Sequence, residues 1–316
     1  MNISNIKNFI RKTLRFGLYL PISNLVLVYG SRWLNLEALR RINCKRNLTI
    51  QNRIRQYLPT NNSGVEIPTP PLLVENAVWV CWLQGESKMP ELVKVCLQSI
   101  RHNANGHEVI LLTKDNYHQY VHLPEIALKR YSEGNLSHAH FADIMRMNLL
   151  AQQGGLWLDA TMLLTSALDE NIFKMPFFSI KTLPAGFFVS ECRWAVFAIA
   201  CNRADALISC VSKAFENYMK ANDILIDYFL FDHFINLACK QFPELDEIIS
   251  AIPFNNPGVH DLRDRLTMPF DANVLKSLTS ETSMFKLNTR TYTEEQLTSS
   301  DMSFYKHFRN LYLHNL

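Results

Sequence analysis

A single aspartate within an apolar segment is the feature that most constrains this chain. Residues 156–164 read Leu-Trp-Leu-Asp-Ala-Thr-Met-Leu-Leu, which predicts a core strand with Asp159 inside it. A polar group that is buried without a partner costs roughly a few kcal/mol. Asp159 therefore requires a cation, a hydrogen-bond donor or a ligand, and the surrounding fold has to supply it.

The segment before this strand reads as a helix that ends in a tight turn. Ser137 can cap the helix, which carries Asp143 and Arg146 three residues apart and therefore on one face. An Asp–Arg pair at this spacing is also typical of an ordinary helix salt bridge. Gly154 and Gly155 end the helix in a conformation that other residues resist, and the strand follows at once.

The order of the other elements predicts an α/β fold with a mostly parallel sheet. Residues 77–83 and 108–112 are short apolar runs, and a helix that begins near Pro90 separates them. A strand–helix–strand order of this length implies a βαβ unit in a parallel sheet. Further strands are predicted at residues 177–180 and 194–201, and further helices at 124–133, 204–220 and 224–240.

Composition places the chain among globular proteins with a sizeable core. Of the 316 residues, 48% are hydrophobic and 19% are charged, which excludes a disordered chain. The seven cysteines are an odd number and form no Cys-x-x-Cys pair. This pattern favours reduced thiols in a cytosolic protein over a disulfide framework or a zinc site.

Charge is distributed unevenly along the chain. Residues 1–56 hold eleven Lys and Arg and one acid, so this segment carries +10 and leaves −7 for the rest of a chain of net charge +3. A basic segment beside an acidic body suggests contact with an anionic surface, either lipid headgroups or nucleic acid. Nucleic acid is disfavoured, because the segment shows no helix-turn-helix, zinc finger or series of stacking aromatics.

We expect residues 1–72 to form a basic helical arm with a linker, and residues 73–316 to form the main domain. Residues 4–16 have the helical spacing and basic face of an interfacial helix. Residues 16–30 are apolar but too short to span a bilayer, and Pro21 interrupts them. We interpret residues 1–30 as a membrane-surface attachment; the alternative is an arm that packs on the body or on a partner.

The predicted strand end can bind a phosphorylated ligand. Asp159 and Thr161 are two residues apart and share a face of the strand. A carboxylate at the carboxyl edge of a parallel sheet can hold a hard divalent cation, which in turn binds a diphosphate. Asp143 and Arg146 can hold sugar hydroxyls by charge-assisted hydrogen bonds. Trp82, at the end of the first strand, can stack on a base.

The block AHFADIMRMNLLAQQGGLWLDAT resembles the central block of the capsular polysaccharide synthesis protein family. That family is akin to the initiating α-mannosyltransferases of yeast type and to the large glucosylating toxins. The shared pattern is Asp-x-x-Arg, about ten residues, Gly-Gly, an aromatic residue and an Asp-x-Asp motif. The matching residues are Asp143, Arg146, Gly154, Gly155, Trp157 and Asp159. The opening block, with Trp82 and Gly85, and residues 226–235 are also similar, so the resemblance covers roughly residues 75–290.

The resemblance implies a GT-A fold, with a Rossmann-type sheet flanked by helices, and a glycosyltransferase. The donor would be a nucleotide sugar, with a UDP-sugar expected first, and the acceptor a saccharide or lipid-linked saccharide of a growing capsular or other surface polysaccharide. Transfer with retention is common in the wider group. We expect a cytoplasmic enzyme, peripheral on the inner face of the membrane, with no nucleic-acid partner.

The resemblance also assigns roles to residues of the site. Asp143, Arg146 and Asp159 would be catalytic. The donor would contact Asp143 and Arg146 together with Trp82, Gly85, Gly155 and Lys286. Mn²⁺ or Mg²⁺ would bind to Asp159 and Thr161. Here the sequence departs from the family pattern, because Thr161 stands where a second aspartate is expected. A site with one carboxylate fewer should bind a cation more weakly, or need the donor diphosphate to complete it.

Two alternatives remain open from the sequence. An inverting transferase would need a base, and Asp227 and Asp232 on the predicted helix are candidates; they also fit solvated helix acids. The missing second acid suits a non-catalytic protein that binds nucleotide sugars or acts as a scaffold in a polysaccharide assembly complex.

Overall fold

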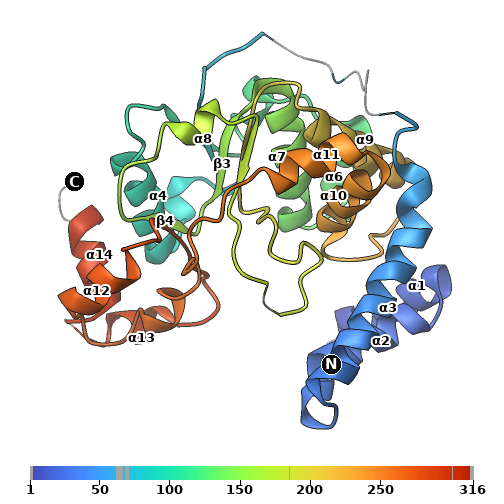
Figure 1. The fold of residues 1–316 in the computed structure, drawn as a ribbon, viewed down its shortest axis with the longest axis horizontal. Helices are drawn as coiled ribbons and strands as arrows, with labels where there is room; N and C mark the ends of the chain where they lie inside the picture. Colours follow the sequence, from blue (N-terminus) through green and yellow to red (C-terminus); the bar gives the residue numbers. More distant parts are fainter. Residues whose placement is uncertain (1–2, 62–66, 68–70, 185, 301, 314–316) are drawn as a thin grey trace.

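The computed structural model describes residues 3–61, 67, 71–184, 186–300 and 302–313. It is a mixed α/β fold built on a five-stranded sheet of order β2-β1-β3-β6-β5 (Figure 1). The strands of this sheet are β1 Val78–Cys81, β2 Val109–Leu112, β3 Gly155–Asp159, β5 Phe177–Ser179 and β6 Ala198–Cys201. A separate two-stranded ribbon pairs β4 Met162–Leu164 with β7 Met284–Lys286.

The helices are distributed along the whole described chain. Their bounds are α1 Ile3–Phe16, α2 Tyr19–Tyr29, α3 Leu36–Ile54, α4 Glu91–His102, α5 Tyr117–Tyr120, α6 Glu125–Ser132, α7 His138–Gln153, α8 Asn171–Lys174, α9 Ala206–Ala221, α10 Leu230–Gln241, α11 Pro243–Ser250, α12 Ala272–Leu278, α13 Glu294–Thr298 and α14 Phe304–Leu313.

The central sheet is mostly parallel, as predicted. Strand β1 pairs in parallel with both β2 and β3, whereas β6 runs antiparallel to β3 and to β5. Four strands therefore point in one direction and β6 alone is reversed. The carboxyl ends of β1 and β3 meet at one edge, where α/β sheets bind ligands.

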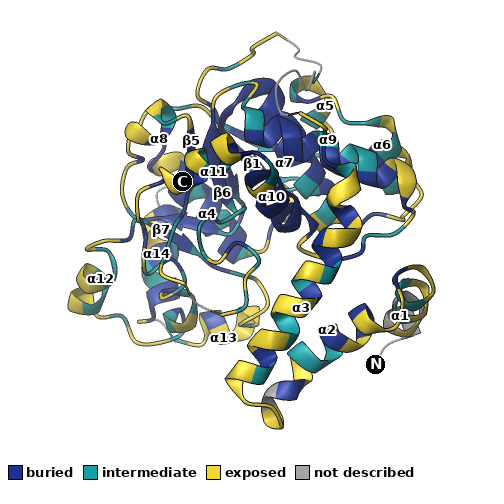
Figure 2. Ribbon diagram, turned by 45° about the vertical axis from the view of Figure 1, so that its right-hand side comes forward, coloured by how far each residue is buried: buried dark blue, intermediate teal, exposed yellow. Residues whose placement is uncertain are grey.

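Both faces of the sheet are buried, which explains why its strands are apolar without alternation. Trp79 and Trp157 are register partners on one face, and they pack in a cluster with α7, α9 and α10. Val80 and Leu158 are register partners on the other face, and they pack in a cluster with α4 and α8. The two layers of helices hold the strand ends, and hence the site residues, in fixed positions (Figures 1 and 2).

The Gly154–Gly155 turn joins α7 to β3 in a space that admits no side chain. Both glycines have positive φ, 69° and 87°. A Cβ on Gly155 would lie 2.5 Å from the Ala77 carbonyl oxygen, and one on Gly154 would lie 2.7 Å from the Arg203 amide nitrogen. The indole of Trp79 donates to the Gly154 carbonyl at 2.8 Å. Glycine is required at both positions by conformation and by close approach.

The predicted strand over residues 156–164 is wrong in one respect, because it is two strands. β3 ends at Asp159, a turn follows at Ala160 and Thr161, and β4 leaves the central sheet to pair with β7. The sequence gives no periodic signal for such a change of sheet, since the apolar residues of this segment are buried both in β3 and in β4. The strand predicted at 194–201 is likewise shorter, because only residues 198–201 pair with β3 and β5.

The N-terminal arm forms three helices that project from the body, with α3 leading back to it (Figures 1 and 2). Ile50 and Ile54, at the body end of α3, are buried in the same cluster as α9 and α10. Arg46 forms a buried ion pair with Asp227. Within the described residues, no helix is both long enough and apolar enough to cross a bilayer. The domain boundary at residue 72 stays a prediction.

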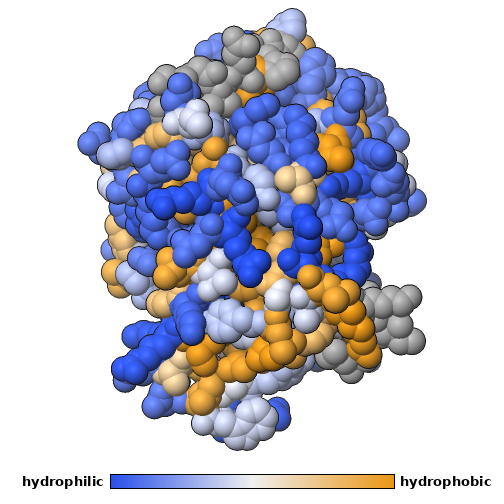
Figure 3. Space-filling model, turned by 90° about the vertical axis from the view of Figure 1, so that its right-hand side faces the viewer, coloured by the Kyte–Doolittle hydropathy of each residue, from blue (hydrophilic) through white to orange (hydrophobic). Residues whose placement is uncertain are grey.

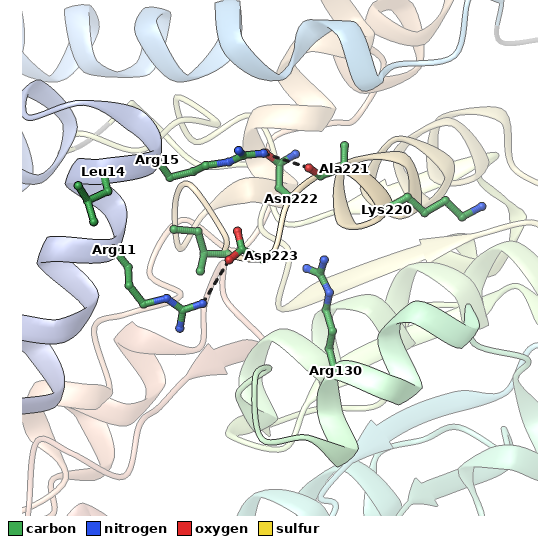
Figure 4. A pocket seen from close by; sticks show the side chains of 9 residues that line it. Arg11, Leu14, Arg15, Arg130, Lys220, Ala221, Asn222 and Asp223 are labelled. Atoms are coloured by element: carbon green, nitrogen blue, oxygen red, sulfur yellow. Dashed lines mark hydrogen bonds and ion pairs between the residues drawn. The ribbon is translucent and has the colours of Figure 1, made fainter.

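Helix α1 touches the body a second time, beside the end of α9 (Figure 4). Arg15 donates to the Ala221 carbonyl at 3.1 Å, and Arg11 lies 3.5 Å from the Asp223 carboxylate. Arg130 and Lys220 line the same shallow hollow, which gives it a positive character. The contacts between arm and body thus include a buried ion pair on α3 and polar contacts on α1.

Candidate functional site

The candidate site lies at the edge of the sheet where β1 and β3 end. Cys81 and Asp159 are register partners at these ends. Trp82 and Gly85 follow β1 directly, and Thr161 lies in the turn that follows β3. The β4–β7 ribbon, which carries Lys286, adjoins this edge through the turn that follows β3. The ends of β1 and β3 and the β4–β7 ribbon therefore meet at this edge, where the Lys286 side chain contacts Asp159 and Thr161.

Arg146 is the centre of a cluster of charged side chains that also contains Asp143, Asp159 and Lys286. Its side chain is 3% exposed. One terminal nitrogen donates to Asp143 Oδ1; the other lies 3.2 Å from Asp159 Oδ1 and 2.6 Å from the Val196 carbonyl oxygen. The guanidinium also lies 5.4 Å from the ring centre of Trp157. A buried guanidinium that binds two carboxylates positions both of them and neutralises their charge.

Lys286 binds Asp159 from the opposite side. Its Nζ lies 2.6 Å from Asp159 Oδ2 and 2.8 Å from Thr161 Oγ1. The other oxygen of Asp159, Oδ1, accepts from the Trp157 indole at 3.0 Å in addition to Arg146. Both oxygens of the carboxylate are therefore engaged by protein donors. Asp159, which the sequence predicted to need a partner, therefore has three: Arg146, Trp157 and Lys286.

The pKa values of the two carboxylates of the cluster are shifted in opposite directions. Burial opposes ionisation of Asp159, but Lys286 and Arg146 outweigh it and lower the pKa of this carboxyl. Burial raises the pKa of Asp143 to about 6, against the effect of Arg146 and with a further contribution from the charge of Asp159. Asp159 is thus a stable anion, whereas Asp143 can change protonation just below neutral pH.

Trp82 and Gly85 lie at the site edge without a contact to Asp159 among the described interactions. The Trp82 ring is half-buried, and its buried Nε1 has no hydrogen-bond partner within the described part of the chain. Gly85 has φ 84° and precedes a short 3₁₀ turn. A buried donor nitrogen without a partner is unfavourable, and this marks the end of β1 as an unusual place in the fold.

Gly155 is not brought to the cluster. It begins β3, whereas Asp159 ends it. Since a strand rises about 3.3 Å per residue, the two positions are roughly 13 Å apart. The close approach of the Ala77 carbonyl to Gly155 explains the glycine by the turn alone. The predicted donor contact of Gly155 therefore has no geometric support.

Asp227 and Asp232 differ from the helix acids expected from the sequence. Asp227 precedes α10 rather than lying on it, and its carboxylate is buried against Arg46 with His233 Nε2 at 3.7 Å. Asp232 is on α10, accepts from the Trp194 indole at 2.9 Å and is 9% exposed. Neither is solvated, so the interpretation as solvated acids is wrong, and both carboxylates are engaged within the protein.

Tyr228 is a site neighbour that sequence reasoning did not single out. Its ring stands edge-on to His140 with centroids 5.2 Å apart, and His140 precedes Asp143 by almost one turn of α7. Burial and then the charge of Asp143 raise the pKa of the Tyr228 phenol. Tyr228 also lines the hollow between the arm and the body. Its place beside a loop aspartate carries no periodic signal that could have marked it.

The residues expected to bind Mn²⁺ or Mg²⁺ do not fit a divalent cation in this arrangement. Such ions take several oxygen ligands. In the described residues, no group of three or more His, Cys, Asp and Glu side chains is arranged to hold a metal ion. The only acid of the expected pair, Asp159, faces the Lys286 ammonium, which also contacts Thr161. The metal stays a prediction from the resemblance.

Of the comparisons with known proteins, the match to a family pattern agrees with the resemblance. The pattern of the family described as "Capsular polysaccharide synthesis protein" matches residues 32–308. No curated protein matches the chain. Among 14 matching chains of solved structures is one titled "PaToxG Glycosyltransferase", with a TM-score of 0.42 and 12% identity; the alignment covers 87% of this chain and 98% of that one. A similarity at this level says nothing about the activity of this chain.

Proposed function

The chain belongs to the capsular polysaccharide synthesis protein family, and we propose that it is a glycosyltransferase that transfers a sugar from a nucleotide-sugar donor to a growing capsular or other surface polysaccharide. The carrying observation is the buried Arg146, which joins Asp143 and Asp159 at the carboxyl edge of the sheet. A guanidinium this deeply buried, with a carboxylate on each side, is an expensive arrangement for a purely structural role.

The parts of the cluster suit different parts of the donor. Asp143 is 23% exposed and can accept hydrogen bonds from sugar hydroxyls, while Arg146 fixes its orientation. Lys286 is 20% exposed and offers a positive charge to the diphosphate. Trp82 has a half-buried aromatic ring directly after β1, where a base can stack. We expect a UDP-sugar as the donor.

We propose transfer with retention of configuration. The bond between the anomeric carbon and the phosphate oxygen breaks, and its electron pair leaves with the nucleoside diphosphate. The acceptor hydroxyl oxygen forms the new bond on the same face, and its proton passes to the leaving diphosphate. This route needs no protein base, which agrees with Asp227 and Asp232 both being engaged within the core. Proton NMR of the fresh product would show the anomeric configuration.

A donor screen tests the proposal. The full chain is incubated with a set of nucleotide sugars, and release of nucleoside diphosphate is measured. We expect Asp159→Ala to lower release by at least about a hundredfold, in line with loss of an electrostatic group in an active site. Asp264→Ala is the control, because Asp264 is an exposed acid that pairs with its neighbour Arg263. Equal release by the wild type and Asp159→Ala would remove Asp159 from the mechanism.

A non-catalytic role is the second candidate, and Thr161 is the observation that favours it. A protein that only binds nucleotide sugars would keep the Arg146 cluster while losing an acid of the Asp-x-Asp motif. Calorimetry with nucleotide sugars, combined with the release assay, separates the two functions. Binding without any hydrolysis or transfer supports a binding or scaffold protein, whereas turnover excludes it.

We further propose that the tip of the arm binds the anionic inner face of a membrane, where a lipid-linked acceptor would be found. The tip is the turn between α2 and α3, and its apolar side chains are exposed, with Trp33 at 79% and Tyr29 at 61%. Arg32 and Arg40 are exposed beside them. Figure 3 shows apolar side chains gathered on the lower part of the face that carries the arm. Exposed aromatic and basic residues together suit a lipid interface.

Flotation with vesicles tests the membrane contact. We expect binding to vesicles that contain phosphatidylglycerol and not to vesicles of phosphatidylcholine alone. Trp33→Ser should weaken this binding, whereas Leu183→Ser, which removes a 71% exposed apolar side chain from the body, should not. Equal binding by the two variants would contradict a contact through the tip.

A further inference from the structure

We infer that the ammonium group of Lys286 takes the place of a divalent cation, so that this chain binds the donor diphosphate without a metal. The inference rests on the proposed function, since it concerns the same donor site. It starts from one geometric fact: Lys286 Nζ lies between the two residues that the resemblance assigns to the metal, 2.6 Å from Asp159 Oδ2 and 2.8 Å from Thr161 Oγ1.

The backbone fixes the lysine in this position. Lys286 ends β7 and is the register partner of Met162 on β4. Its own amide donates to the Val259 carbonyl at 2.7 Å, and the next amide, of Leu287, donates to the Thr161 carbonyl at 2.9 Å. The ribbon that carries the cation is therefore tied to Thr161, one of its two oxygen partners, in the turn that directly follows Asp159. Backbone hydrogen bonds therefore fix the position of Lys286 relative to this turn.

The charges balance without a metal. An Asp-x-Asp motif with a divalent cation sums to zero, because two negative charges meet two positive ones. Here Thr161 removes one negative charge, and a lysine supplies one positive charge in place of two. Asp159 with Lys286 again sums to zero, so the same electrostatic condition is met with one charge fewer on each side. The threonine and the lysine thus compensate each other.

The ammonium retains capacity for a ligand. Lysine has three N–H donors, and two are directed to Asp159 and Thr161. Its side chain is 20% exposed, whereas Arg146 is 3% exposed and committed to Asp143, Asp159 and Val196. Lys286 is therefore the member of the cluster that can meet a phosphate oxygen. A positive charge at that place would stabilise the charge that develops on the leaving diphosphate.

Calorimetry with uridine diphosphate, and with pyrophosphate as a probe that lacks a base, tests the inference. Each probe is titrated into the full chain with EDTA and then with Mn²⁺. We expect the wild type to bind equally well in both conditions. Lys286→Met should weaken binding by about tenfold to a hundredfold, as for loss of a charge-assisted hydrogen bond. Lys276→Met, an exposed lysine on α12, is the matched control and should bind as the wild type does.

A second variant asks whether the lysine and the metal are interchangeable. Thr161→Asp combined with Lys286→Ala restores the second acid and removes the ammonium, and we expect binding of the probe to become dependent on Mn²⁺. Thermal unfolding in the absence of probe checks that each variant is folded. If Lys286 had only a structural role, its removal would not make binding of the probe depend on Mn²⁺.

The possible failures are distinguishable. Binding by the wild type that needs Mn²⁺, or binding by Lys286→Met in EDTA that equals the wild type, overturns the inference and leaves the proposed function intact. No binding of either probe under any condition overturns both, since it contradicts the donor site itself. Binding in EDTA without sugar transfer retains the inference and favours the non-catalytic alternative.

Discussion

Arg146 and Asp159 lie 13 residues apart in the sequence, and the Gly154–Gly155 turn brings them face to face, with Arg146 Nη1 3.2 Å from Asp159 Oδ1. The turn reverses the chain between α7 and β3, so a residue early in the helix meets a residue at the end of the strand. The contact between Arg146 and Asp159 therefore depends on the whole helix–turn–strand unit. A substitution at either residue should also affect the stability of that unit.

Replacement of Arg146 should damage both stability and activity. Arg146→Met leaves two carboxylates without their common partner, and we expect the free energy of unfolding to fall by about 3–5 kcal/mol. Arg146→Lys keeps a charge but cannot contact Asp143, Asp159 and the Val196 carbonyl together. It should remain closer to wild-type stability and still lose about a hundredfold in kcat/KM. Urea unfolding and the release assay measure the two effects separately; a fully active Arg146→Lys would contradict the positioning role.

Asp232 should make stability depend on pH. Burial raises the pKa of its carboxyl to about 6 in the folded chain, from an ordinary value of 3.8. Between these values the folded chain holds a proton that the unfolded chain has released, so stability falls as the pH rises through this window, by on the order of 3 kcal/mol. Asp232→Asn removes this dependence while keeping an oxygen for the Trp194 indole.

The measurement is urea unfolding of the wild type and Asp232→Asn at several pH values between 4 and 7. The difference in unfolding free energy between the two proteins should shift in favour of the variant as the pH rises. Two curves that run parallel across the window would show that Asp232 is ionised alike in the folded and unfolded chains.

The helix, the turn and the end of β3 could be predicted because their signals are local. Ser137 caps α7 by accepting from the His140 amide, as its position before the helix predicts. The glycine pair and the aspartate are also visible in the sequence. The family membership follows from the same short block, and the family match over residues 32–308 confirms it.

The contact of Asp159 with Lys286 could not be predicted from the local sequence pattern. Lys286 is 127 residues away from Asp159, and it arrives there through the pairing of β4 with β7. That pairing requires β3 and β4 to be separate strands, which the uninterrupted apolar run conceals. Gly155 is the converse case: the motif assigns it a donor contact, yet it begins β3, at the opposite end of the strand from Asp159.

The glycine turn offers a test with a matched control. Gly155 and Gly106 both have φ 87°, but a Cβ on Gly155 would lie 2.5 Å from the Ala77 carbonyl, whereas a Cβ on Gly106 meets no atom within 4 Å among the described residues. We expect Gly106→Ala to cost about 1 kcal/mol from backbone strain alone, and Gly155→Ala to cost more than about 3 kcal/mol because a clash is added. An equal loss of unfolding free energy in the two variants would mean that the positive φ of Gly155, and not the close approach of the Ala77 carbonyl, requires glycine at the turn.

The attachment of the arm should depend on one buried ion pair. Arg46 and Asp227 have side chains that are 10% and 4% exposed, and they join α3 to the loop before α10. Arg46→Met leaves Asp227 buried without its guanidinium partner, so we expect a loss of about 3–5 kcal/mol in unfolding free energy. Arg41→Met is the control, because Arg41 pairs with Glu37 at the surface, where an ion pair contributes about 0–1 kcal/mol.

Limited proteolysis of the same two variants locates the effect. If the ion pair holds the arm, Arg46→Met should be cut within residues 1–56 faster than the wild type and faster than Arg41→Met, while the body resists. The two variants should differ because the Asp227 carboxylate is buried and also accepts from the Phe229 amide at 2.8 Å. We expect it to stay in the core without a guanidinium partner when Arg46 is replaced. Identical cleavage rates for the two variants would show that the apolar contacts of Ile50 and Ile54 hold α3 on their own.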